Sequence, residues 1–188
     1  LYEDHGADLT EHLRGMFGFA VWDRSTATLT LARDRVGKKP LYYFEDGSRL
    51  WFASELKSLL AVGRIPRQVD PVALHHYLTY QYVPHPWSIV QGIKKLPPGS
   101  RLIWRDGRCR VERYWQLDYP DRHESMTATP DELAEDFRRR LVEATKIRMI
   151  SERPLGAFLS GGLDSSAVVA AMARTSATPV KTFSIGFS

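Results

Sequence analysis

The chain has 188 residues, of which 43% are hydrophobic and 26% charged, and its formal net charge is +4. This composition is typical of a soluble globular protein and leaves room for one large domain or parts of two. The single cysteine, Cys109, excludes an internal disulfide and fits a reducing cytoplasm. No apolar stretch approaches the roughly 18 residues of a membrane span, and the start does not resemble a signal peptide.

The basic residues are scattered along the chain. Their densest run, Arg138-Arg139-Arg140, lies in a predicted amphipathic helix. The charge therefore favours a solvated helix face over a nucleic-acid-binding patch.

The first half of the chain alternates apolar stretches with turn signals. Strands are predicted at 16–22, 28–32, 41–44 and 50–53, separated by turn sequences at 23–26, 37–40 and 45–48. The connections are short, so we expect antiparallel hairpins.

Helices and one more hairpin complete this half. A short helix is predicted at 54–62, and Asp70 begins a second helix that runs to about Gln81 with Pro71 at its favoured first position. A hairpin follows, pairing 100–104 with 109–114 across Asp106-Gly107.

The composition becomes polar between residues 117 and 129, which we interpret as a domain linker. It ends at a capping box, Thr129 with Glu132, and the next helix places four apolar residues on one face. These are Leu133, Phe137, Leu141 and Ala144.

The remaining elements predict a βαβ unit of a parallel sheet. A strand at 154–159, suited to burial on both faces, leads into a glycine loop, a helix at 165–174 and a strand at 180–187. Two strands are too few for an independent sheet, and the chain begins at Leu1 rather than methionine. We therefore expect that both ends of the sequence are cut.

The glycine loop reads Ser160-Gly161-Gly162-Leu163-Asp164-Ser165-Ser166. A turn from strand to helix offers unpaired N–H groups and the positive end of the helix dipole to a phosphate, and two glycines allow close approach. The serines add hydroxyl donors. Asp164 would repel a bare phosphate, so it indicates a magnesium ion that bridges carboxylate and phosphate oxygens. The alternative is a glycine-rich turn with serines that cap a helix.

This loop resembles the PP-loop of ATP pyrophosphatases, which split ATP between its α and β phosphates. Upstream motifs, including Ala32-Arg33-Asp34-Arg35 and Arg113-Tyr114-Trp115, are similar to the later part of the class II glutaminase domain of asparagine synthetases. The similarity covers nearly the whole chain, at residues 15–23, 32–43, 52–57, 92–99, 113–115 and 160–166. Taken singly, the upstream residues have structural explanations: alternating core positions, or a local ion-pair and turn cluster of Arg33, Asp34 and Lys39.

The resemblance implies an α+β class II glutaminase domain at 1–116, the linker at 117–129, and an α/β PP-loop synthetase domain at 130–188, the first and last being partial. It implies ATP and Mg²⁺ as cofactors and Asp164 as the Mg²⁺ ligand. The nucleotide-binding residues would be Leu159, Ser160, Gly161, Gly162, Asp164, Ser165, Ser166 and Ile185. Apart from the loop, Leu159 and Ile185 would line the adenine site, although core packing explains them nearly as well.

In the family, an N-terminal cysteine releases ammonia from glutamine, and ammonia displaces AMP from an adenylated aspartate. The chain begins after the segment that would carry that cysteine, so we expect no catalytic glutaminase residue in it. Cys109 is interpreted as inert, and neither His75 nor His76 shows metal or nucleophile-base spacing.

Three functions stay open on the sequence alone. They are a glutamine-hydrolysing asparagine synthetase, a related amidotransferase acting on another carboxylate, and a non-catalytic nucleotide-binding remnant. The expected partners are small molecules, namely glutamine, ATP, and aspartate or another carboxylate. Nucleic acid and a membrane span are not expected, the expected location is the cytoplasm, and a homodimer of the full-length protein stays open.

Overall fold

The computed structural model describes residues 1–119 and 128–186. The chain divides into two compact units, unit 1 at 1–118 and unit 2 at 119–188. Most of the predicted linker, residues 120–127, lies outside the described residues. Within the described ranges, no helix is both long enough and apolar enough to cross a membrane.

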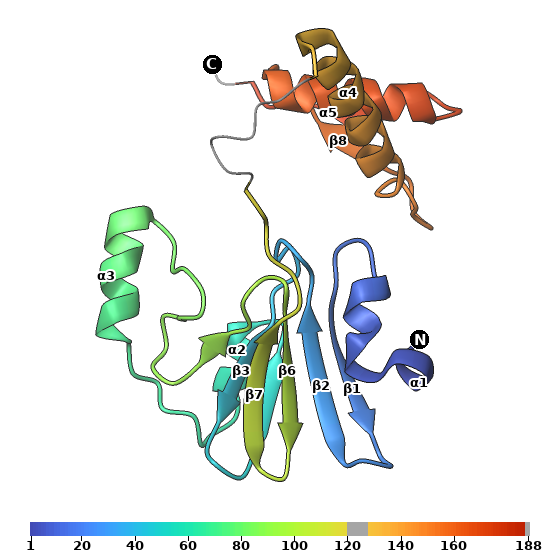
Figure 1. The fold of residues 1–188 in the computed structure, drawn as a ribbon. Coiled ribbons are helices and arrows are strands. Elements are labelled where there is room, and N and C mark those ends of the chain that lie inside the picture. The colour runs from blue at the N-terminus through green and yellow to red at the C-terminus, as the bar shows by residue number, and fades with distance from the viewer. Residues whose placement is uncertain (120–127, 187–188) are drawn as a thin grey trace. The chain divides into compact units, whose positions relative to one another are not determined.

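Unit 1 contains a four-stranded antiparallel sheet in the order β1-β2-β6-β7 (Figure 1). The expected hairpins β1 with β2 and β6 with β7 are both present. The sheet is completed by the pairing of β2 with β6, which places Leu31 opposite Leu102. The strands are Gly18–Asp23, Thr28–Arg33, Ser100–Arg105 and Arg108–Arg113.

A second antiparallel sheet has the order β4-β3-β5, with β3 at Tyr42–Glu45, β4 at Leu50–Ala53 and β5 at Lys94–Lys95. The turn at 37–40 does not form the expected hairpin, because β2 and β3 belong to different sheets. Side chains impose this path: the buried Asp34 carboxylate accepts from the backbone N–H groups of Lys38 and Lys39, both at 2.9 Å.

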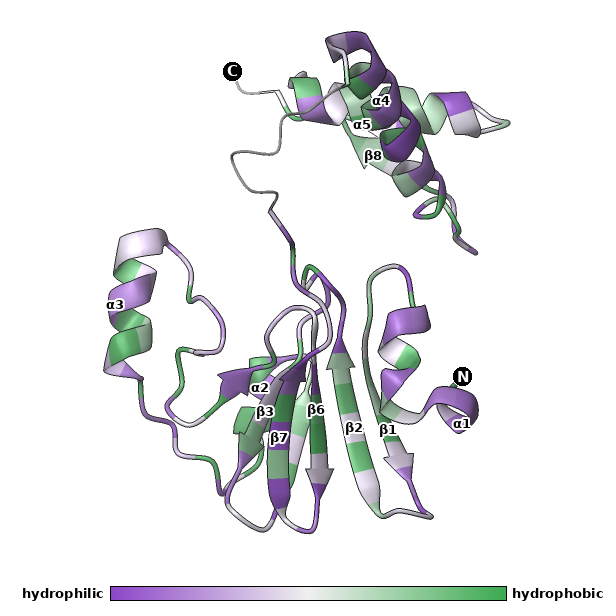
Figure 2. Ribbon diagram, viewed as in Figure 1, coloured by the Kyte–Doolittle hydropathy of each residue, from purple (hydrophilic) through white to green (hydrophobic). Residues whose placement is uncertain are grey.

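The main core of unit 1 lies between the two sheets. Leu31 and Leu102 from the first sheet pack with Leu41, Tyr43 and Leu96, and all five are buried. Figure 2 shows the apolar residues along β2 and β6 that supply this core. A second cluster packs against partly buried Tyr42 and Phe44 and consists of Leu59, Ile65, Val90 and Ile93. Tyr43 belongs to the main core, so successive residues of β3 point to opposite faces of the sheet.

Helices surround these sheets. The predicted helix at 54–62 is shorter, α2 at Leu56–Leu60, and α3 spans Pro71–Tyr80. The Asp70 carboxylate accepts from the N–H groups of Val72 and Ala73, which confirms the predicted cap, and left-handed Gln81 ends the helix. Before the first strand lie α1 at Tyr2–His5 and a 3₁₀ helix at Gly6–His12, for which the sequence analysis made no prediction.

Unit 2 contains α4 (Pro130–Lys146), β8 (Gly156–Phe158), α5 (Leu163–Thr175) and β9 (Lys181–Phe183). The capping box of Thr129 and Glu132 is present. The strands β8 and β9 are parallel, which confirms the predicted βαβ unit. The predicted strand at 180–187 is shorter, and its Phe187 lies outside the described residues.

The expectation that β8 is buried on both faces is wrong. Phe158 is 78% exposed, and Phe183 on its partner strand is 57% exposed. Within the described residues β8 pairs only with β9, so no further strand shields the pair. The apolar sequence shows that the side chains of the strand are hydrophobic. Whether they are buried depends on which other elements pack against the strand.

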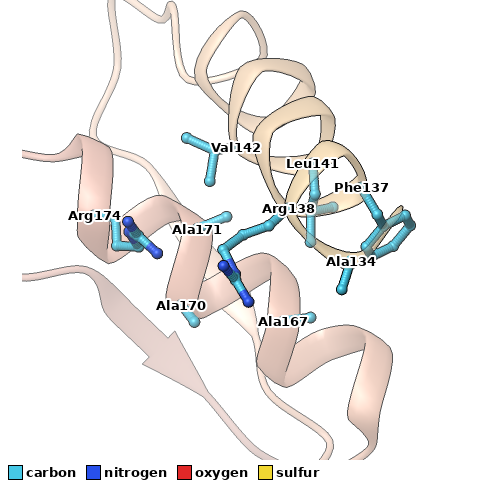
Figure 3. A pocket seen from close by; sticks show the side chains of 9 residues that line it. All are labelled: Ala134, Phe137, Arg138, Leu141, Val142, Ala167, Ala170, Ala171 and Arg174. Carbon is cyan, nitrogen blue, oxygen red and sulfur yellow. The ribbon is translucent and has the colours of Figure 1, made fainter. Parts of the chain in front are cut away.

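The helices α4 and α5 form an apolar groove of about 390 Å³ (Figure 3). Phe137 and Leu141 from the predicted apolar face of α4 line it, together with small residues of α5. The groove lining contains no residue of the glycine loop, so we assign it no part in nucleotide binding.

Candidate nucleotide-binding site

The glycine loop joins the end of β8 to the start of α5. Strand pairing runs to Phe158 opposite Phe183, and the Leu159 N–H then donates to the Phe183 carbonyl at 2.8 Å. The loop therefore leaves the sheet at the carboxyl ends of two parallel strands. Open α/β sheets bind their ligands at this edge.

The two glycines have different roles in the loop. Gly161 has a φ of +80°, and no atom lies within 4 Å of the position that a Cβ would occupy. Its requirement is conformational rather than steric, because side chains disfavour this φ. Gly162 is the N-cap of α5 and offers no side-chain cap, so the first N–H groups of the helix have no capping side chain. Such groups are suited to a phosphate oxygen.

Two hydroxyls of the loop bond to each other. The Oγ atoms of Ser160 and Ser165 lie 3.1 Å apart, and the Ser165 hydroxyl donates to the Gly162 carbonyl at 3.1 Å. Because Ser165 has one hydroxyl proton, Ser160 is the donor in the bond between them. A phosphate that accepts from either hydroxyl must replace one of these bonds. Ser166 follows on the same turn, with its N–H donating to the Gly162 carbonyl.

Asp164 lies exposed in the first turn of α5. The described residues provide no hydrogen bond or ion pair to its carboxylate, so both oxygens are available to a ligand. A carboxylate beside serine hydroxyls is the hard oxygen donor set that Mg²⁺ prefers, and Mg²⁺ commonly takes one or two protein carboxylates plus phosphate oxygens and water. No group of three or more His, Cys, Asp or Glu suited to a metal occurs within the described ranges. The residues thus fit a shared ion rather than an all-protein cage.

Leu159 and Ile185 lie at the same edge of the sheet. They follow β8 and β9, and Ile185 is 75% exposed. Core packing therefore does not account for Ile185 in this structure. An apolar side chain beside the loop is suited to contact with the flat face of a base.

Ser184 is a residue that the sequence analysis did not single out. Its hydroxyl donates to the Leu159 carbonyl at 2.6 Å. From the sequence, Ser184 lies inside the predicted strand at 180–187, where a hydroxyl residue carries no functional signal. The contact with Leu159 depends on the register of two strands, and sequence does not supply it.

The other candidates take structural places. Cys109 lies half-buried in β7, and burial raises the pKa of its thiol to about 12, which keeps it protonated at neutral pH and agrees with the inert interpretation. The His76 ring packs on Trp87 with ring centroids 4.9 Å apart. Cys109 and His76 belong to unit 1 and lie far from the loop in sequence.

The side chains of Arg33 and Asp34 stabilise a turn rather than form a reaction centre. The Arg33 guanidinium donates to the carbonyls of Gly37, Lys39 and Leu96, each at 2.7 Å. The turn cluster expected from the sequence is present, but its bonds join side chains to the backbone, and Lys39 contributes through its backbone.

Comparisons with known proteins agree with both halves of this description. Residues 1–115 match the family of the glutamine amidotransferase domain, and residues 136–188 match that of asparagine synthase. Asparagine synthetase [glutamine-hydrolyzing] 1 of Bacillus subtilis is 35% identical over 99% of this chain and 29% of its own length. Amidase chry2 of Gibberella zeae is 37% identical over 89% of this chain and 25% of its own length.

The chain spans about a third or less of the length of such curated relatives. The two matches follow each other in one chain, and the second ends beyond a loop with the features of a phosphate-binding turn. Asparagine synthetase [glutamine-hydrolyzing] 3 of Bacillus subtilis, 34% identical, aligns over 99% of the chain. The chain belongs to the asparagine synthetase family, with a glutamine amidotransferase domain at residues 1–115.

Proposed function

We propose that the whole protein is an ATP-dependent, glutamine-hydrolysing asparagine synthetase, in which the loop at 160–166 binds the phosphates of ATP. The observation that carries this proposal is the open loop at the carboxyl ends of β8 and β9, with uncapped N–H groups and two serine hydroxyls. Its Asp164 carboxylate receives no hydrogen bond or ion pair from the described residues. The family supports the reaction type, and the relatives' names support the acceptor.

Each loop group has a separate task in this proposal. The N–H groups at the start of α5 and the hydroxyls of Ser160 and Ser165 hold the β and γ phosphates, which leave together as pyrophosphate. Leu159 and Ile185 contact the base. Asp164 would hold Mg²⁺, which when bound neutralises charge on the phosphates. Attack of the aspartate carboxylate on the α phosphate then forms an acyl-adenylate, from which ammonia displaces AMP.

The ammonia would come from glutamine hydrolysis by the amidotransferase domain. In unit 1 the described residues form a packed scaffold of two sheets, and its cysteine is protonated at neutral pH. We therefore propose that unit 1 supports the glutamine site, and that Cys109 takes no part in the hydrolysis.

A second candidate function differs only in the acceptor. A relative named Amidase chry2 is as similar to this chain as the synthetases are, at 37% identity. The loop groups are suited to phosphate and magnesium and do not specify the acceptor, so their geometry is compatible with another carboxylate. Measuring pyrophosphate release by the full-length protein with aspartate and with other carboxylic acids decides between the two acceptors.

Asp164→Asn in the full-length protein tests the proposal. The amide keeps the size of the carboxylate but removes its charge, so the bound Mg²⁺ loses a ligand. We expect acceptor-dependent pyrophosphate release to fall by about 100-fold or more, equivalent to a few kcal/mol of transition-state stabilisation. Glutamine hydrolysis should change by less than about tenfold, since it belongs to the other domain.

Asp131→Asn is the matched control, because Asp131 is also an exposed aspartate in the first turn of a helix of unit 2. It should leave both activities unchanged. Circular dichroism must show that both variants are folded. Pyrophosphate release at the wild-type rate by Asp164→Asn would remove Asp164 from the metal site and reduce the loop to a structural turn.

A further inference from the structure

The bond between Ser184 and Leu159 lies at the point where the two parallel strands separate. The Leu159 N–H donates to the Phe183 carbonyl at 2.8 Å, and the Leu159 carbonyl accepts from the Ser184 hydroxyl at 2.6 Å. Both backbone groups of Leu159 are thus held by consecutive residues of the segment that ends β9. Leu159 is the residue directly before the glycine loop.

The second of these bonds replaces a regular ladder bond. In a parallel ladder in which residue 159 donates to residue 183, its carbonyl accepts from the N–H of residue 185. Here the Ser184 side chain makes that bond instead, and the regular pairing ends at Phe158 with Phe183. The N–H of Ile185 therefore does not make the ladder bond to Leu159. The end of β8 nevertheless stays hydrogen-bonded to the end of β9.

This arrangement couples the two parts of the proposed nucleotide site. Leu159 and Ser160 belong to the loop side, whereas Ile185, which is 75% exposed, belongs to the β9 side. Within the described residues, two hydrogen bonds join the two sides beyond the last strand pair: the one from the Leu159 N–H and the one from the Ser184 hydroxyl.

We propose that Ser184 is a positioning residue of the nucleotide site, and that its hydroxyl sets the position of Leu159 and the loop start relative to Ile185. The inference rests on the proposed nucleotide binding by the loop. Ser184 acts through Leu159 and need not touch the nucleotide. Its removal should therefore weaken ATP binding without abolishing the reaction.

The chain offers a matched control for the loss of a hydroxyl. Ser176 lies directly after α5, and its Oγ donates to the Thr178 carbonyl at 2.7 Å. Both serines are half-buried or exposed residues of unit 2 that bond a backbone carbonyl, but Ser176 makes its bond within the connection to β9. A purely structural effect should appear in both variants. An effect on nucleotide binding should appear only when Ser184 is changed.

The experiment uses the full-length protein with Ser184→Ala, Ser184→Thr and Ser176→Ala. Dissociation constants for Mg²⁺-ATP are measured by calorimetry, with Tm and the glutaminase rate measured on the same preparations. We expect Ser184→Ala to weaken Mg²⁺-ATP binding about two- to tenfold, the range that one net hydrogen bond produces. The Thr variant keeps the hydroxyl and should restore most of the affinity, and Ser176→Ala should bind as the wild type does.

Amide hydrogen exchange supplies a second readout that does not depend on activity. Ser184→Ala should speed exchange at the Leu159 N–H, while Ser176→Ala leaves it unchanged. Unchanged affinity and unchanged exchange in Ser184→Ala would overturn the inference, as would equal losses of affinity in Ser184→Ala and Ser176→Ala. Failure of the wild-type protein to bind Mg²⁺-ATP would instead overturn the proposed function, so the two failures are distinguishable.

Discussion

The two units place their apolar residues differently. In unit 1 two sheets enclose a core in which Leu31, Leu96 and Leu102 are fully buried. In unit 2 the buried apolar residues of the described part are Ala171 and Met172, both on α5, while Phe158 in β8 and Leu163 in the loop are 78% and 85% exposed. The loop for which we propose phosphate binding thus lies in the less enclosed unit.

This difference indicates that folding stability and ligand binding depend on different residues. Fully buried leucines contribute most to the free energy of folding, because their removal leaves a cavity. Exposed apolar residues contribute little to folding in this structure but are free to contact a ligand. We therefore expect substitutions in unit 1 to act on stability, and substitutions around the loop to act on binding.

The largest expected effect on stability comes from Leu102→Ala in unit 1. Leu102 is fully buried opposite Leu31, so its truncation should lower the free energy of unfolding by about 2–5 kcal/mol. Leu163→Ala in unit 2 is the comparison, since Leu163 is 85% exposed, and it should cost less than about 1 kcal/mol. Chemical denaturation followed by tryptophan fluorescence and circular dichroism measures both. Equal losses would contradict the contrast between the units.

An intermediate effect is expected in unit 1 at alkaline pH. Burial raises the pKa of Tyr43 and of Tyr114 to about 12 from an ordinary value of 10. A raised pKa means that folding favours the protonated form, so this stability is complete below pH 10 and is lost as the pH rises towards 12. The free energy of unfolding should fall by at most about 1.4 kcal/mol per pH unit for each tyrosine.

Tyr43→Phe tests the alkaline effect, because phenylalanine fills the same site, 5% exposed, without titrating. Stability measured from pH 8 to pH 12 should fall less steeply in this variant than in the wild type. Cys109, whose pKa is also raised to about 12 and whose charge contributes to the raised pKa of Tyr43, titrates in both proteins. Parallel curves would exclude Tyr43 as the titrating group.

The smallest effect is expected at the start of α4 in unit 2, and on the acid side. Thr129→Ala removes the hydroxyl that accepts from the Glu132 N–H and should cost about 1 kcal/mol. Hydrogen bonds from Thr129 lower the pKa of Glu132, so this carboxylate stabilises the helix above its ordinary pKa and stops doing so as the pH falls. Hydrogen exchange in α4 measures both effects, and Glu132→Gln should remove the acid dependence. Unchanged protection in Thr129→Ala would show that the cap does not hold the helix.

Local features were predictable from sequence because their partners lie within a few residues. Asp70 caps α3 through N–H groups two and three positions ahead, and Thr129 with Glu132 forms the expected capping box. The hairpins β1 with β2 and β6 with β7 follow from short turns between strand-forming stretches.

The candidate site was predictable only in part. The sequence indicates which loop groups are chemically suited to phosphate and magnesium, since glycines, hydroxyls and a carboxylate have those properties wherever they lie. It does not indicate that the Ser160 and Ser165 hydroxyls lie 3.1 Å apart, because two rotamers and the helix start decide that distance. The bond from Ser184 to Leu159 was not foreseen because it depends on the register of β8 and β9.

The sequence by itself determined the caps, the turns, the strand-forming stretches and the residues of the glycine loop, all of which depend on backbone preferences and on neighbours within about one helical turn. The tertiary structure alone decided that β2 pairs with β6 instead of β3, that β8 is exposed, and that Ser184 reaches Leu159. These outcomes depend on contacts between segments far apart in the chain. Periodicity shows which face of a strand is apolar, but only the packed neighbours determine whether that face is covered.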